Sequence, residues 1–255
     1  MAASPPPAHI GIGGWDYDPW RQTFYPPGLP KTKQLQFASR EVNAIEINAT
    51  FYKLQRPELF ERWADAVPDG FVFAVKGSRF CTNRKVLGEA AEAIARFCGQ
   101  GFTRLGPKLG PILWQFAETK KFDPEDVAAF LALLPREQDG LKLRHVIEAE
   151  HESFRDSRFA DMAGEAQVAI CLVDNGGEAV ADLDTAPFVY ARLKNGRSDE
   201  ASGYSEAELD AWAQRVEGWI SVPKPRETFL FFIGGAKERN PAAAKALAAR
   251  LEGTH

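Results

Sequence analysis

The sequence predicts an α/β fold, a (β/α)8 barrel of the TIM type. Eight short apolar segments alternate with about seven helical ones along a chain of 255 residues, and this alternation is typical of a parallel sheet covered by helices. Eight such units favour closure of the sheet into a barrel. A doubly wound open sheet is the competing fold, but the glycines at 11–14 open no helix, as a dinucleotide-binding fingerprint would.

The expected strands are short apolar runs that end at polar residues or glycine. They lie at 9–15, 44–50, 71–76, 110–116, 145–150, 168–174, 188–193 and 228–233. The expected helices lie between them, at 31–41, 57–66, 88–98, 124–134, 155–164, 205–219 and 240–251. Pro57 suits a first helical position, and Ser205 with Glu208 forms a capping-box pattern. Residues 175–187 are too few and too broken for a full helix, so the helix between strands six and seven is short or missing.

Composition bounds the class of protein. A net charge of −4 and a pI of about 5.7 give no general attraction to nucleic acid or an anionic membrane. Three cysteines without a CxxC pair suit free thiols in a reducing cytosol. No apolar run is long enough to cross a bilayer. Residues 1–8 are proline-rich, lack the features of a signal peptide and are expected to be a disordered lead-in to one barrel domain at 9–252. We expect a soluble, cytoplasmic protein.

Polar side chains stand at the ends of seven of the eight expected strands. In the second strand, for example, Glu46 and Asn48 share one face of an otherwise apolar run, because side chains at i and i+2 point the same way. Active sites of TIM barrels lie at this end of the strands. The sequence therefore predicts a polar site there; a salt-bridged plug that fills the barrel mouth is the structural alternative. The strand-end residues are Trp15, Glu46, Asn48, Lys76, Gln115, Glu148, Glu150, Asp174 and Arg192.

The mixed charges of this rim suit a small ligand with hydroxyls and an anionic group, such as a sugar phosphate or sugar acid. Arg192 is expected to clamp the anion. Lys76 is expected to be a second anion contact, a general base or a Schiff-base amine, or else the ion-pair partner of Glu46 or Glu148. Glu46 and Glu148 are acid/base candidates. If Glu46 is structural, its expected partner is Lys76 on the adjacent strand. The reaction class stays open among lyase, isomerase and hydrolase.

Two other functions remain open. A metal-dependent nucleic-acid-binding or endonuclease-like barrel would need an open groove flanked by cations, and the acidic pI and few histidines argue against it. His151 with Glu46, Glu148 and Asp174 is a usable ligand set for magnesium or manganese, but no HxH or HxxxH spacing supports it, so no metal site or cofactor is predicted. A non-catalytic ligand sensor is the third possibility. The groove cations would be Arg79, Arg84, Lys85, Lys194 and Arg197.

Several motifs together resemble the YecE-like family, known as domain of unknown function 72. They are GIGGWDYDPW, IEINATFY, FAVKGS, LGPILWQF, IEAEH, LVD and YARL, in this order. The resemblance implies a (β/α)8 barrel and supplies no reaction. The site positions that match the family pattern, and are expected to bind or act on the ligand, are Trp15, Glu46, Asn48, Tyr52, Lys76, Gln115, Glu148, His151, Asp174 and Arg192.

The chain also departs from that pattern. Glu150 stands where the resemblance implies an arginine, and Asn83 and Lys194 stand where it implies histidines. Gly234 and Gly235 replace asparagines after the eighth strand. We therefore expect a divergent member of that family with altered ligand specificity.

Overall fold

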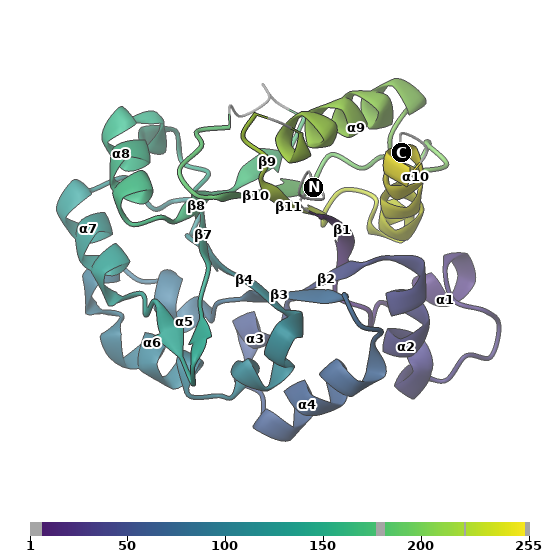
Figure 1. The fold of residues 1–255 in the computed structure, drawn as a ribbon, viewed down its shortest axis with the longest axis horizontal. Coiled ribbons are helices and arrows are strands. Elements are labelled where there is room, and N and C mark those ends of the chain that lie inside the picture. The colour runs from purple at the N-terminus through teal and green to yellow at the C-terminus, as the bar shows by residue number, and fades with distance from the viewer. Residues whose placement is uncertain (1–6, 177–181, 222, 253–255) are drawn as a thin grey trace.

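The computed structural model describes residues 7–176, 182–221 and 223–252. Within them, nine strands form one parallel sheet that curls into a nearly closed barrel, with the larger helices outside it (Figure 1). The strand order is β8-β7-β4-β3-β2-β1-β11-β10-β9. The strands are β1 (Ala8–Gly13), β2 (Ala44–Ile47), β3 (Val72–Lys76), β4 (Leu109–Gln115), β7 (His145–Glu148), β8 (Ala169–Ile170), β9 (Leu172–Asp174), β10 (Phe188–Leu193) and β11 (Glu227–Phe232).

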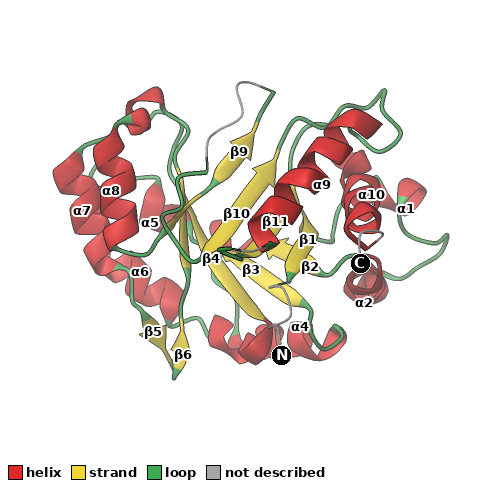
Figure 2. Cartoon of the chain, turned by 45° about the horizontal axis from the view of Figure 1, so that its top comes forward, coloured by secondary structure: helices red, strands yellow, loops and turns green. Residues whose placement is uncertain are grey.

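All eight expected strands are present, and the sixth is split at Cys171. Its first half, β8, pairs with β7, and its second half, β9, pairs with β10. Between the halves, the Cys171 amide donates a hydrogen bond to the Ile147 carbonyl at 2.8 Å. The two edges of the sheet are therefore consecutive parts of one segment, residues 169–174. A small antiparallel pair outside the barrel, β5 (Glu137–Gln138) and β6 (Leu141–Lys142), was not expected (Figure 2).

The expected helices are also present, most with ends within two residues of the prediction, and the capping box of Ser205 and Glu208 is formed. The helices are α1 (Trp20–Thr23), α2 (Lys31–Glu41), α3 (Ala49–Tyr52), α4 (Pro57–Ala66), α5 (Arg79–Thr82), α6 (Ala91–Cys98), α7 (Pro124–Leu133), α8 (Ser157–Glu165), α9 (Glu206–Ile220) and α10 (Asn240–Glu252), with 3₁₀ helices η1 (Leu87–Glu89), η2 (Phe102–Lys108), η3 (Glu152–Arg155) and η4 (Lys237–Arg239).

Three predictions about connections can be compared with this structure. The helix expected at 88–98 is divided into η1 and α6. In the connection from β9 to β10, residues 175–176 and 182–187 form no helix, while 177–181 lie outside the described residues. Most of the predicted N-terminal lead-in also lies outside them, and β1 begins at Ala8. Among the helices that the structure describes, none is both long and apolar enough for a membrane span.

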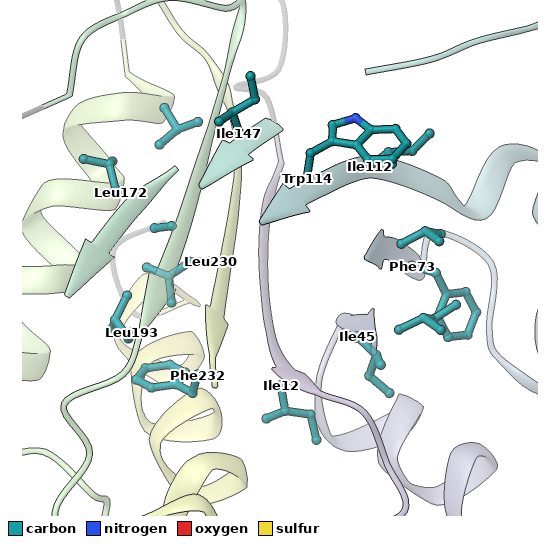
Figure 3. Close-up of a cluster of buried hydrophobic side chains, with 14 of the residues drawn as sticks. Ile12, Ile45, Phe73, Ile112, Trp114, Ile147, Leu172, Leu193, Leu230 and Phe232 are labelled. Atoms are coloured by element: carbon teal, nitrogen blue, oxygen red, sulfur yellow. The ribbon is translucent and has the colours of Figure 1, made fainter. Parts of the chain in front are cut away.

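Alternation along the strands produces two buried layers. One set of side chains packs between the sheet and the helices. Figure 3 labels some of its members, namely Ile12, Ile45, Phe73, Ile112, Trp114, Ile147, Leu172, Leu193, Leu230 and Phe232. The intervening side chains fill the barrel interior, among them Ala44, Val72, Ala74, Leu113, Val146, Cys171, Tyr190, Phe229 and Phe231. Continued toward the strand ends, this second face presents polar residues to the interior.

Candidate functional site at the strand ends

A buried guanidinium joins two carboxylates across the barrel. Arg192 lies on β10 and is 2% exposed, while Glu46 on β2 and Glu148 on β7 are both 0% exposed. Nη1 of Arg192 donates to Oε2 of Glu148 at 2.5 Å, and Nη2 donates to Oε1 of Glu46 at 3.1 Å. Nε lies 3.1 Å from Oε2 of Glu46, within ion-pair distance but outside hydrogen-bond geometry. The Tyr190 hydroxyl donates to the same Oε2 at 2.7 Å.

A second set of polar groups surrounds Glu148. Its Oε1 accepts hydrogen bonds from Nζ of Lys194 and Nε2 of Gln115, both at 2.6 Å. Lys194 also donates to Oε1 of Glu150 at 2.7 Å. The Cys171 thiol lies 3.9 Å from Oε2. Glu148 thus has donors at both oxygens, and the Lys194 and Glu150 side chains form a partly exposed layer above it, 19% and 21% exposed.

These contacts fix the charge of Glu148. Burial alone would raise its pKa, but Arg192 and Lys194 outweigh burial and hold the pKa of Glu148 at about 2. In the same way, burial would lower the pKa of Arg192, but Glu46 and Glu148 raise it well above its usual value. Glu148 is therefore an ionised carboxylate near neutral pH, with no proton to donate and little tendency to accept one.

Lys76 differs from every other cation of this cluster. It ends β3, is 7% exposed, and its ammonium forms no ion pair or hydrogen bond within the described part of the chain. Nζ instead lies 4.2 Å from the centroid of the Phe51 ring. Burial lowers the pKa of Lys76 to about 8; Arg192 acts in the same direction, while Glu46 and Glu148 oppose it. Near neutral pH the group is thus close to its protonation midpoint.

The alternative in which Lys76 forms an ion pair with Glu46 or Glu148 is wrong. Glu46 instead pairs with Arg192, which lies three strands away in the sheet order. The physical reason is geometric: a planar guanidinium presents donors in several directions and can bridge two carboxylates, whereas an ammonium acts as a point charge. The Arg192 bridge corresponds to the salt-bridged plug that the sequence left open. Lys76 is not part of it.

The other predicted residues lie at varying distances from this network. Asn48 donates from Nδ2 to the Glu46 carbonyl at 3.2 Å, beside the site but without contacting its charges. His151 caps η3, accepting from the Ser153 amide at 3.1 Å. Among the described residues, no group of three or more His, Cys, Asp or Glu side chains is placed to hold a metal ion.

The side chains of Trp15, Tyr52 and Asp174 do not contact the charged network. Trp15 packs edge-on against Trp63, with ring centroids 5.1 Å apart, on the helix-facing side of the sheet. Tyr52 is 63% exposed on α3. Asp174 follows inward-facing Val173, so alternation turns it outward, where Oδ1 accepts from the Gly176 amide at 3.2 Å. The structure therefore brings together Glu46, Lys76, Gln115, Glu148 and Arg192.

The prediction of site residues missed Tyr190, Lys194 and Phe51. Tyr190 and Lys194 lie two residues either side of Arg192, on the same strand face, so the i, i+2 rule could have found both. Lys194 was considered only as a groove cation, and Glu150 only as a strand end. Phe51 lies on the single-turn helix α3, which is too short to leave a periodic signal in the sequence.

Comparison with known proteins identifies the family. The family described as "Protein of unknown function DUF72" matches residues 9–255. UPF0759 protein YecE of Escherichia coli (strain K12) is 28% identical over 141 residues, which cover 54% of this chain and 48% of YecE. This chain therefore matches about half the length of that relative.

Two solved structures share the fold. A DUF72 family protein from Thermotoga maritima MSB8 superposes with a TM-score of 0.72 at 19% identity, covering 97% of this chain and 98% of the other. One from Enterococcus faecalis V583 gives a TM-score of 0.69 at 17% identity, covering 96% and 95%. The family match over nearly the whole chain confirms the resemblance, and the chain belongs to the DUF72 family of proteins of unknown function.

Proposed function

We propose that the strand-end cluster binds a small, hydroxylated anionic metabolite, such as a sugar phosphate or sugar acid, and catalyses proton transfer on it. The observation that carries the proposal is Lys76, a 7% exposed cation without a counter-ion among the described residues. Removing a charge from water is costly unless it is paired. An anionic ligand at the barrel mouth would supply the missing negative charge.

The surrounding groups suit such a ligand. Gln115, Glu150 and Lys194 are partly exposed and carry donors and acceptors for hydroxyl groups. Lys76, with a pKa of about 8, is the best acid/base candidate, because a catalytic group works best when its pKa is near the working pH. Glu46 and Glu148 hold Arg192 in place. Arg192 itself is occupied by these two carboxylates, so the protonated form of Lys76 is the cation that attracts the anion.

A thermal-shift screen tests the binding step. The full chain is heated with ribose 5-phosphate, glucose 6-phosphate or gluconate, and with neutral ribose and glucose as controls. A ligand at about 100 times its Kd adds about 2.7 kcal/mol to stability, or about 5–10 °C in a chain of this size. The anionic ligands should stabilise the wild type and not Lys76→Met, while exposed Lys85→Met should respond as the wild type does.

Equal responses to anionic and neutral sugars, or an unchanged response in Lys76→Met, would refute the proposal. For each stabilising ligand, proton NMR in D2O then follows loss of a carbon-bound hydrogen. Exchange or conversion that requires Lys76 supports catalysis, and binding without either indicates a ligand sensor.

One observation favours nucleic acid as a second candidate ligand. Tyr52 and Phe80 are 63% and 65% exposed, and the Arg79 guanidinium lies 5.5 Å from the Phe80 ring centroid. Exposed aromatic rings beside cations are a platform for stacked bases. Lys194 and Arg197, however, are engaged by carboxylates. Anisotropy titration with a single-stranded oligonucleotide at several salt concentrations would distinguish this function, since phosphate contacts give a steep salt dependence.

A further inference from the structure

We infer that Lys76 is a Schiff-base lysine, and that the ligand's reacting group is an aldehyde or ketone. This inference rests on the proposed ligand site, replaces the acid/base role of Lys76 with a nucleophilic one, and names the substrate class more narrowly, as an anionic carbonyl compound such as an aldose phosphate. It follows from the position of the amine, which lies buried at the mouth of a charged barrel and has no ion-pair partner in the described ranges.

The backbone holds this amine in a fixed place. The carbonyl of Lys76 accepts a hydrogen bond from the Thr50 hydroxyl at 2.7 Å, and the next amide, of Gly77, donates to the Leu113 carbonyl at 2.8 Å. The strand end that carries the side chain is therefore hydrogen-bonded to α3 and to β4. Its Nζ lies against the Phe51 ring. A nucleophile positioned in this way loses little conformational entropy when it reaches a bound carbonyl carbon.

The nearby Lys194 provides an internal comparison. Its ammonium donates to Glu148 at 2.6 Å and Glu150 at 2.7 Å. Burial would lower the pKa of Lys194, but these carboxylates raise it above its usual value. Lys194 thus retains its proton, and a protonated amine has no lone pair with which to attack a carbonyl. Two lysines at one barrel mouth therefore differ in reactivity because only one has carboxylate partners.

The groups that surround the Lys76 ammonium influence how readily it loses its proton. Phe51 on α3 offers no hydrogen bond; Arg192 and Lys194 repel the ammonium, while Glu46 and Glu148 attract it but are bonded to other donors. With a pKa of about 8, about one tenth of Lys76 is free amine near pH 7. That fraction is about 300-fold larger than for an ordinary lysine, and free amine is the nucleophilic form.

The reaction is a condensation without redox change. The Nζ lone pair forms a bond to the carbonyl carbon, and the C=O π electrons move to oxygen, which gains a proton as nitrogen loses one. The hydroxyl of this carbinolamine gains a second proton, its C–O bond breaks, and water leaves with that electron pair. The remaining nitrogen lone pair forms the C=N bond, and the iminium ion so formed carries the positive charge of the added proton. Solvent carries the protons, because Glu148 holds none near neutral pH.

Reductive trapping tests the inference. The full chain is incubated with glyceraldehyde 3-phosphate and sodium cyanoborohydride, which delivers hydride to the C=N bond, and the adduct is located by peptide mass spectrometry. Lys76 should be labelled at least 10-fold faster than any other lysine, including Lys194, with a rate that rises toward a plateau above about pH 8. Neutral glyceraldehyde should label it more slowly. 3-Phosphoglycerate, an anion without a reactive carbonyl, should compete with labelling.

Variants separate this inference from the proposed function. Lys76→Arg keeps the cation but cannot form an imine, so it should bind 3-phosphoglycerate in the thermal-shift assay and give no adduct at position 76. Lys85→Met should label as the wild type does. Binding of 3-phosphoglycerate with uniform, slow labelling of all lysines would overturn the Schiff-base role and leave the anion site standing. If the wild type neither binds 3-phosphoglycerate nor shows preferential labelling of Lys76, the proposed function and the Schiff-base role are both refuted.

Discussion

Arg192 and Lys76 are both buried cations close to Glu46 and Glu148, yet their surroundings differ. Arg192 is held by two fully buried carboxylates, whereas Lys76 has an aromatic ring beside its ammonium. Burying an ion pair brings little net stability, because desolvation opposes the attraction, but removing one partner leaves a charge buried alone. The two residues should therefore respond to substitution in opposite ways.

Arg192→Met should be strongly destabilising. It leaves Glu46 and Glu148 facing each other without their shared cation, a change that typically costs about 3–5 kcal/mol. Urea unfolding followed by circular dichroism measures the cost. Arg96→Met, which removes an exposed helical pair with Glu92, should change stability by less than about 0.5 kcal/mol. If Arg192→Met lowered the free energy of unfolding by as little as Arg96→Met does, the Arg192 bridge would not be needed to hold the two buried carboxylates.

Lys76→Met should stabilise the protein by about 1–3 kcal/mol near pH 7, because it removes a desolvated cation. The folded-state pKa of about 8 is below the ordinary 10.5, so between these values the unfolded chain binds more protons and wild-type stability rises with pH. The advantage of Lys76→Met should therefore shrink as pH rises from 8 to 10.5. Urea unfolding at several pH values checks this; a destabilised Lys76→Met would indicate an important structural role for the ammonium.

Glu148→Gln should reveal the depressed carboxyl pKa. With a folded-state pKa of about 2 against an ordinary 4.5, the ionised carboxylate stabilises the fold above pH 4.5, and this contribution is lost as pH falls toward 2. The stability difference between wild type and Glu148→Gln should be largest near neutral pH and shrink over that range. Glu92→Gln, at an exposed pair, should give a small difference at every pH. A Glu148 difference that is independent of pH would contradict the assigned pKa.

At the scale of elements, the barrel depends on close strand approach at β1. A methyl group at Gly11 would lie 2.1 Å from the Ala44 carbonyl oxygen on β2. Gly164 in α8 is the matched control, because a methyl group there meets nothing within 4 Å. Gly11→Ala should lower the thermal midpoint, since one of the two backbones must move, while Gly164→Ala should raise stability by about 0.4–1 kcal/mol. A neutral Gly11→Ala would show that β1 and β2 can separate without cost.

The sequence predicted elements where periodicity spans enough residues. Long helices such as α4 and α9 were located within one residue, because apolar spacing and caps mark them. The single-turn helices α3 and α5 leave no such signal. Asp174 shows a rule applied incompletely: strand alternation from Val173 already turns it outward. Trp15 was expected at a strand end for a different reason that also failed: β1 ends at Gly13, and the chain turns away at Gly14, where φ is +73°, before it reaches Trp15.

Across the whole molecule, alternation of strands and helices was enough to predict the barrel and the gathering of charges at one end. The pairing of those charges was not predictable, since Glu46 and Arg192 are 146 residues apart and lie on non-adjacent strands. Only the closed barrel places them in contact. The same curling of the sheet brings together Glu150 and Lys194, which form an ion pair at 2.7 Å and so balance each other's charge.

Lys76 carries the proposed chemistry because its amine is buried, has a lowered pKa and lacks an ion-pair partner among the residues that the structure describes. Carbon-13 NMR of the protein labelled at lysine Cε, titrated from pH 6 to 11, tests it most directly, with Lys76→Met to assign the signal. The Lys76 signal is predicted to titrate near pH 8, well below the value of about 10.4 for an ordinary lysine. A Lys76 signal that titrates together with the exposed lysines would contradict the account.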